Sequence, residues 1–335
     1  MTAAPSTPPF SSPLAVCLER FLALKRAAGC RYDTEASALR GLDRFLSAHV
    51  APSDPVITRD HVCAWVARRG GESQTTRAHR LTLIRELCRF LARDDPRTTV
   101  PERHFLGIAR DHVVMRVLTR DEGRAFLRAC DDLSAAPWSP LRAVVLGTLL
   151  VVLYLSGLRL GEAIRLTVDD VDLTRAVLRV RRGKFGKSRL VPVAADLCAR
   201  LAACRTRVEQ RLGVRPRETP FFPTPRGPVS ATYSPSTVRA AFREVLRRAG
   251  IVDRSAGRRL RVHDLRHSYA VLRLLLWCEQ DQDVNAKLPL LATYMGHVGV
   301  ASTQRYLQLT TELLGEIMRR HDAHFGYLIA ERTDP

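Results

Sequence analysis

Hydrophobic residues recur at three- and four-residue steps between residues 13 and 98, a spacing typical of amphipathic helices. Breaks rich in glycine, proline, aspartate and serine separate these periodic stretches. The pattern therefore predicts a small domain of four helices, each with one apolar face turned to a shared core. The predicted helices span residues 15–29, 36–50, 58–69 and 73–93.

The periodicity stops at residues 99–116, where prolines and mixed charges are typical of a linker. Residues 1–12 have neither a basic start nor an apolar run, so we expect a flexible tail rather than a signal peptide. After the linker, Thr119 and Glu122 have the spacing of a capping box, which starts a helix. We therefore expect a second domain over residues 117–335.

The second domain contains the most apolar stretch of the chain, AVVLGTLLVVLYL at 143–155. This stretch is too short to span a bilayer and predicts a buried core helix. The segments 176–182 and 188–193 flank the glycine-containing loop 183–187, which predicts an antiparallel hairpin. Helical patterns follow. The expected fold class is therefore mainly α with a small antiparallel β-sheet, in two domains.

The chain is strongly basic. It has 53 Lys and Arg against 34 Asp and Glu, a formal net charge of +19 and a pI near 10.5, while 46% of its residues are hydrophobic. A globular protein with this charge is suited to a large polyanion, most simply nucleic acid. Its 8 cysteines are scattered without a CxxC pair, which favours the reduced thiols of a cytoplasmic protein over disulfides or a zinc site.

Arginines follow one another along the predicted helix at 73–93. Arg85, Arg89 and Arg93 recur every four residues and share a face. Such a row is either a solvated surface or a set of phosphate contacts, and the sequence leaves both open. The candidate DNA contacts of this domain are Arg77, Arg80, Arg85, Arg89 and Arg93.

Two segments of the second domain place cations in tight connections. Arg159 follows Gly157, a residue suited to ending a helix, so its guanidinium either pairs with a carboxylate such as Glu162 or points into a site. Lys184 and Lys187 lie at the tip of the predicted hairpin. Most hairpin lysines are merely solvated, but an ammonium on such a tip could reach a DNA groove and donate a proton.

Two further segments combine histidines with an arginine or a tyrosine. His263 and Arg266, three residues apart in HDLRH, share one side of a helix start, where free amide groups suit an anion. His297 and Tyr306 are nine residues apart in GHVGVASTQRY. Each motif is weak alone, because a packed histidine or a half-buried tyrosine is the ordinary alternative.

Taken together, LSGLRLGE, the hairpin GK, HDLRH and GHVGVASTQRY resemble the boxes of the tyrosine recombinases, or phage integrase family, across the whole second domain. The 25-residue step from Arg159 to Lys184 also looks like family spacing. The preceding bundle is similar to the family's core-binding domain. The step from Arg266 to His297 is longer than in Xer-type members, and GHVGVAST looks more like transposon-associated members.

The resemblance implies that Tyr306 attacks a DNA phosphate and forms a 3′-phosphotyrosyl bond. Arg159 and Arg266 would stabilise the phosphate in place of a metal ion, so no cofactor is expected. The resemblance also assigns three further catalytic roles. These are Lys184 as general acid, with Lys187 as the fallback, His263 in proton transfer from the tyrosine, and His297 as a hydrogen-bond donor to the phosphate.

It also implies a homotetramer on a double-stranded DNA site with inverted repeats, which exchanges strands through a Holliday junction to integrate, excise or transpose a mobile element. Partner recombinases or accessory proteins could assist. We expect Glu162 to orient the arginine-bearing turn and His267 to be a packed residue rather than a proton carrier. Two alternatives are DNA relaxation like that of a type IB topoisomerase and a catalytically silent DNA-binding accessory protein.

Overall fold

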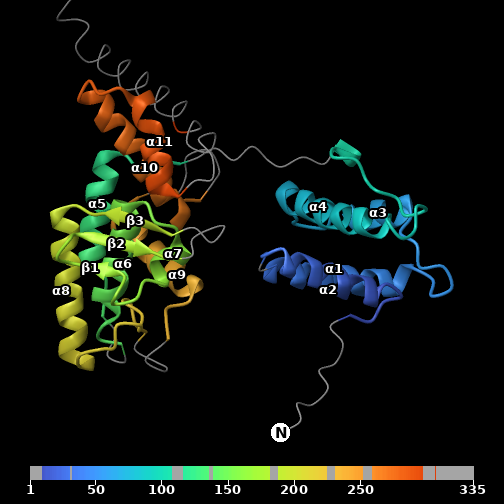
Figure 1. Ribbon diagram of the computed structural model, residues 1–335. Helices are drawn as coiled ribbons and strands as arrows, with labels where there is room; N and C mark the ends of the chain where they lie inside the picture. Colours follow the sequence, from blue (N-terminus) through green and yellow to red (C-terminus); the bar gives the residue numbers. More distant parts are fainter. Residues whose placement is uncertain are drawn as a thin grey trace, which may run out of the picture. The chain divides into compact units, whose positions relative to one another are not determined.

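The computed structural model divides the chain into two compact units, Met1–Val113 and Val114–Pro335 (Figure 1). The structure describes residues 10–30, 32–107, 116–135, 139–181, 188–224, 231–251 and 259–296, together with Tyr306.

The first unit is a bundle of four helices, as the hydrophobic pattern predicts. Its core is formed by the apolar faces of all four, and Leu39, Leu42, Ile84 and Leu87 are completely buried in it. Side chains define two of the helix starts, because Thr58 caps α3 and Ser73 caps α4 through backbone amides. The elements are α1 (Ala15–Ala27), α2 (Asp33–His49), α3 (Arg59–Val66), α4 (Gln74–Leu91) and the 3-10 helix η1 (Phe105–Gly107).

The core of this unit extends beyond the bounds expected from the sequence. Phe10, in the predicted tail, and Phe105, in the predicted linker, are both buried in the bundle core. The chain next to Phe10 is fixed by Asp43, whose carboxylate accepts the amide hydrogens of Ser11 and Ser12 at 2.9 Å each. Burial would raise the pKa of Asp43, but these hydrogen bonds lower it. Residues 10–12 therefore belong to the folded unit.

The expected arginine row is not a single exposed face. Arg85 is buried, and its guanidinium donates to the carbonyl oxygens of Pro101, Glu102 and Arg103 at 3.0, 2.7 and 3.0 Å. This contact explains why residues 101–103 pack on the bundle instead of leaving it as a linker. Arg89 differs, because its side chain is 58% exposed beside Glu86.

The two arginines at the start of α4 also bind the protein itself. Arg80 is buried, forms an ion pair with Glu72 and donates to the carbonyl oxygens of Trp65 and Ala67. Arg77 donates from Nε to the carbonyl oxygen of Val66 at 2.7 Å. These bonds satisfy carbonyl groups at the end of α3, which have no partners within that helix.

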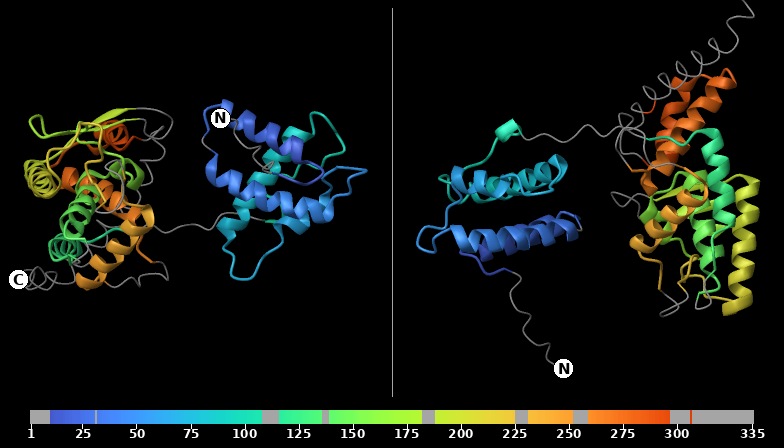
Figure 2. Two further views of the ribbon diagram at one scale, coloured as in Figure 1. Left: turned by 90° about the horizontal axis from the view of Figure 1, so that it is seen from below. Right: turned by 180° about the vertical axis from the view of Figure 1, so that it is seen from behind.

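The second unit is built around α6, a helix that is apolar on nearly every side. Such a helix has to be enclosed, and α6 packs against α5, α7, α8, α9 and α10 (Figures 1 and 2). The predicted core helix at 143–155 is confirmed. No helix in the described parts of the chain is long and apolar enough to cross a membrane. The helices are α5 (Arg120–Asp131), α6 (Arg142–Ser156), α7 (Leu160–Ile164), α8 (Ala195–Leu212), α9 (Pro235–Arg248), α10 (Val262–Glu279) and α11 (Val284–Met295).

A three-stranded antiparallel sheet packs beside these helices in the order β1-β2-β3. The predicted hairpin is confirmed, with Leu178 opposite Val191 and Val180 opposite Arg189, and a short β1 adds a strand that the sequence pattern did not indicate. This register places Arg189 at the start of the third strand, directly after the hairpin loop. The strands are β1 (Val171–Asp172), β2 (Val177–Val180) and β3 (Arg189–Pro192).

Replacing Arg85 tests its structural role. Arg85→Met keeps an apolar stem of similar length but removes the donors for three carbonyl oxygens, so the first unit should lose about 1–3 kcal/mol of stability. Hydrogen exchange of the α1–α4 amides in the full chain measures this loss. Arg89→Met is the matched control and should change stability by less than about 0.5 kcal/mol. Equal effects of the two substitutions would contradict the assignment.

Candidate active site

The candidate site begins at the turn between α6 and α7. Gly157 ends α6 in the left-handed conformation with φ of +61°, and a Cβ there would lie 2.6 Å from Cδ1 of Tyr269, so only glycine fits. The turn places Arg159 at the start of α7. Glu162 holds it in two ways, accepting the Arg159 amide hydrogen at 3.0 Å and its guanidinium Nη1 at 2.8 Å.

Arg189 joins this pair from β3, and sequence reasoning did not single it out. It donates from Nη1 and Nη2 to the two oxygens of Glu162 at 3.1 and 2.9 Å, and from Nε to the carbonyl oxygen of Tyr294 at 2.8 Å. Its side chain is only 11% exposed. The only sequence signal was a charged residue opening an apolar strand, a position that a long cationic side chain often occupies with its head in water.

The carboxylate of Glu162 is therefore shared by two guanidinium groups. Burial alone would raise its pKa, but hydrogen bonds from Arg189 and the Arg159 amide, with the positive charge of Arg189, outweigh burial and lower the pKa to about 2. Glu162 thus stays ionised throughout the physiological range. The expectation that it orients Arg159 agrees with this geometry.

Arg266 approaches the same turn from α10. It is 2% exposed and donates to the carbonyl oxygens of Gly157, at 2.6 Å, and Met295. Arg159 donates from Nη2 to the neighbouring carbonyl oxygen of Gly296 at 2.8 Å. The two candidate phosphate-binding arginines, more than 100 residues apart in the sequence, are thus brought to one place by the ends of α6 and α11.

The charges in this cluster act on one another. Burial and the neighbouring Arg159 lower the pKa of Arg266 to about 10, while Tyr306 and Glu162 act in the opposite direction. Arg266 remains protonated at neutral pH. Three arginines and one carboxylate leave an excess of positive charge in a largely buried cluster, which suits the binding of a phosphodiester.

The phenol of Tyr306 contacts a histidine of α10, the helix that also carries Arg266. Its Oη lies 2.8 Å from Nδ1 of His267, and the tyrosine is 3% exposed. The ring of His263 is perpendicular to that of His267, with centroids 4.7 Å apart, and His263 itself is exposed. The structure thus differs from the expectation in one respect, because His267, which we expected to be a packed residue, contacts the phenol directly.

The start of α10, which carries these histidines, is held rigidly. Asp264 accepts the amide hydrogen of Arg261 at 2.7 Å and so caps the helix. Ser268 donates to the Asp264 carbonyl oxygen at 2.9 Å and accepts the amide hydrogen of Leu118, also at 2.9 Å. Both Asp264 and Ser268 are completely buried. Three other candidates, Lys184, Lys187 and His297, lie outside the described residues.

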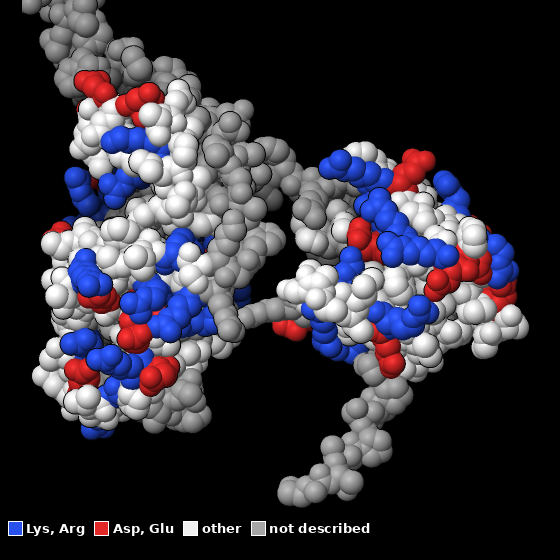
Figure 3. Space-filling view, in the orientation of Figure 1, with Lys and Arg blue, Asp and Glu red and all other residues white. Residues whose placement is uncertain are grey.

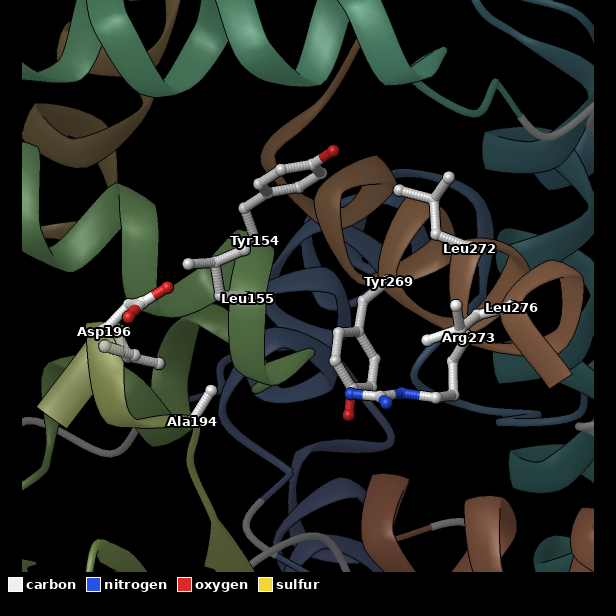
Figure 4. A pocket seen from close by; sticks show the side chains of 9 residues that line it. Tyr154, Leu155, Ala194, Asp196, Tyr269, Leu272, Arg273 and Leu276 are labelled. Atoms are coloured by element: carbon white, nitrogen blue, oxygen red, sulfur yellow. The ribbon is translucent and has the colours of Figure 1, made fainter. Parts of the chain in front are cut away.

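A separate cavity of about 290 Å³ lies between α6, α10 and the start of α8 (Figure 4). Leu155, Leu272 and Leu276 give it apolar walls, and the guanidinium of Arg273 lies 5.7 Å from the ring centre of Tyr269. The arginines and the phenol of the candidate site do not line it. In the described parts of the chain, His, Cys, Asp and Glu form no group of three that could hold a metal ion.

Comparison with known proteins gives the same assignment along the sequence. Residues 116–312 match the model of the phage integrase family, which covers more than half of the chain. The protein y4rE of Sinorhizobium fredii, whose name places it among integrases and recombinases, is 36% identical over 90% of this chain and 94% of its own length. The tyrosine recombinase XerC of Chromobacterium violaceum is 30% identical over 74% of each chain.

Solved structures confirm the fold. The integrase of transposon Tn1549, solved with a circular intermediate DNA, has a TM-score of 0.61 at 15% identity, covering 87% of this chain and 94% of that one. The lambda integrase tetramer, solved on a Holliday junction, has a TM-score of 0.58 at 17% identity, covering 85% of this chain and 77% of that one. With the family model and the close relatives, these likenesses show that the chain belongs to the phage integrase family, the tyrosine recombinases.

Proposed function

We propose that this chain cleaves and rejoins DNA through a covalent bond between Tyr306 and a 3′-phosphate. The observation that carries the proposal is the convergence of a buried phenol and two buried or half-buried guanidinium groups, those of Arg159 and Arg266, from three separate parts of the fold. A structural ion-pair network would not need the tyrosine. A binding surface would not need its cations fixed so firmly by backbone carbonyls.

The chemistry follows from the charges. A phosphodiester repels anionic nucleophiles, so attack requires its non-bridging oxygens to be neutralised in the transition state. A guanidinium group presents a planar fork of donors that fits two phosphate oxygens and does not lose its proton at neutral pH. Arg159 and Arg266 are pre-positioned for that role because the carbonyl oxygens of Gly157 and Gly296 fix their planes.

In the proposed step, Tyr306 attacks the phosphorus and the 5′-oxygen leaves with a proton. Lys184 supplies that proton, with Lys187 as the fallback, and His297 donates a hydrogen bond to the phosphate; both roles rest on the resemblance of the motifs. The phosphotyrosyl bond conserves the energy of the broken phosphodiester, so a new strand can be joined without ATP.

The proposed function also includes a DNA substrate and an oligomeric state. We infer that the substrate is a double-stranded site with inverted repeats and that four copies exchange strands through a Holliday junction, with partner recombinases or accessory proteins possible. The lambda and Tn1549 integrases, solved as a tetramer on a Holliday junction and with a circular intermediate DNA, support this assignment. Their names also support integration, excision or transposition of a mobile element. The amphipathic pattern of residues 310–329 predicts a C-terminal helix, and the family resemblance implies that it packs on a neighbouring subunit; this segment lies outside the described residues.

Basic side chains spread over both units, interleaved with acidic ones (Figure 3). In the first unit, Arg89 and Arg93 are exposed, whereas Arg80 and Arg85 are buried and hydrogen-bonded within the bundle. We therefore keep Arg89 and Arg93 as the candidate phosphate contacts of α4, together with Lys187 from the hairpin of the second unit.

The first prediction concerns the nucleophile. Tyr306→Phe removes the phenolic oxygen and keeps the ring, so the protein should bind its site with unchanged affinity and form no covalent adduct. The measurement is denaturing gel electrophoresis after reaction with a duplex that carries the site found by footprinting, nicked a few nucleotides beyond the cleavage position. An adduct formed by Tyr306→Phe would refute the assignment.

The second prediction concerns the fork of Arg159. Arg159→Lys keeps the positive charge but replaces the planar donor pair with a point charge, so the rate of adduct formation should fall about 10²- to 10³-fold. Arg165→Lys, at the exposed position that ends α7, is the matched control and should react at the normal rate. A normal rate for Arg159→Lys would show that charge alone is sufficient.

The third prediction concerns salt. Affinity for the site should fall steeply as salt rises, with a logarithmic slope of about 0.9 for each phosphate contacted. Arg89→Met and Arg93→Met should each reduce that slope by about one. Fluorescence anisotropy over a salt series measures it. A slope that neither substitution alters would remove α4 from the DNA interface.

A further inference from the structure

We propose that His267 is the general base that takes the proton of Tyr306 during cleavage and returns it during rejoining. The proposal rests on the proposed function, because it names the proton acceptor for that same phenol. It also reassigns a role, since the motif resemblance gave proton transfer to His263 and treated His267 as a packed residue.

The first observation is the contact itself. Nδ1 of His267 and Oη of Tyr306 are 2.8 Å apart, which is hydrogen-bond distance, and their ring centres are 5.6 Å apart. His263 belongs to the same helix, but its ring packs against His267 and it is an exposed residue. The imidazole placed to receive the phenolic proton is therefore that of His267.

The second observation is the rigidity of the support. The residues on either side of His267, Arg266 and Ser268, are buried and hydrogen-bonded to other parts of the fold. The backbone of α10 at this point cannot rotate without breaking those bonds. The imidazole is consequently fixed relative to the arginines that are proposed to bind the phosphate, as a general base must be.

The third observation is the charge around the pair. Arg266 from α10, Arg159 from the α6–α7 turn and Arg189 from β3 are the cations of the cluster, and Glu162 is paired with two of them. Arg116, on the segment before α5, is paired with Glu122. The net positive charge favours the phenolate that forms as Tyr306 loses its proton. This charge therefore helps the proton to leave Oη.

The step balances without any further reactant. His267 begins neutral, with its hydrogen on Nε2 and the lone pair of Nδ1 accepting the hydrogen bond from the phenol. The bond from Oη to phosphorus forms, the bond from phosphorus to the 5′-oxygen breaks, the phenolic proton moves to Nδ1, and the 5′-oxygen receives a proton from the general acid. During rejoining, each of these transfers runs in reverse.

His267→Asn tests the assignment. The asparagine amide can still form a hydrogen bond near the position of Nδ1 but cannot take up a proton at neutral pH. Adduct formation on the nicked duplex at pH 7 should therefore slow about 10²- to 10⁴-fold, with unchanged DNA affinity. The slow rate should then rise about tenfold per pH unit, because the ordinary phenol pKa is about 10 and hydroxide increasingly supplies the phenolate. His263→Asn distinguishes the two histidines, because a rise in rate with pH in that variant and not in His267→Asn would assign the proton to His263.

A second substrate distinguishes removal of the proton from the tyrosine from donation of a proton to the leaving 5′-oxygen. With sulfur in place of the 5′-bridging oxygen, the leaving group no longer needs a proton, so the defect of His267→Asn should persist. Rescue by sulfur, or a wild-type rate and pH profile for His267→Asn, would overturn the proposal. If the wild-type protein forms no adduct, the proposed function itself fails, and this result is distinct from an adduct that forms without His267.

Discussion

The buried carboxylate of Glu162 is the interaction on which the site depends. Two arginines from different elements, Arg159 at the start of α7 and Arg189 at the start of β3, would repel each other at this distance without an anion between them. Removing one partner of such a cluster leaves a buried charge uncompensated, which usually destabilises a protein by about 3–5 kcal/mol. The sheet and the α6–α7 turn are thus joined by electrostatics as well as by apolar packing.

Backbone carbonyl oxygens, together with the Glu162 carboxylate, orient the arginines of the site. Gly157 and Gly296 both end helices in the left-handed conformation, with φ of +61° and +67°, and each turns a carbonyl oxygen toward an arginine. A carbonyl oxygen fixes the plane of a guanidinium group without cancelling its charge. The cluster therefore orients Arg159 and Arg266 while keeping their positive charge available to a phosphate.

Much of the fold could be predicted from the sequence because helices and hairpins have local periods. The four helices of the first unit, the core helix α6 and the β2–β3 hairpin all follow from such patterns. The grouping of Arg159, Arg266 and Tyr306 came from the order of motifs. Contacts made by long side chains could not be predicted in this way. The reach of Arg85 to carbonyl groups 16 to 18 residues further along the chain has no periodic signature.

The contact of His267 with Tyr306 could not be predicted for a related reason. His263 and His267 are one helical turn apart, so spacing alone does not decide which of the two meets a residue 39 or more positions away. Arg189 escaped notice because its partners lie on α7 and at the end of α11. In both cases the contact depends on the tertiary structure, whereas the sequence motifs indicate only which residue types are present.

The burial of Tyr306 has a consequence for the protein when no DNA is bound. Because the residue is 3% exposed, packed neighbours surround it, and a passing phosphodiester would have to displace them to gain access to the oxygen. A ligand that binds more tightly to a form with the phenol exposed would shift the protein toward that form. A chain attracted to nucleic acid of every sequence by its charge would in this way be restrained from breaking genomic strands at random.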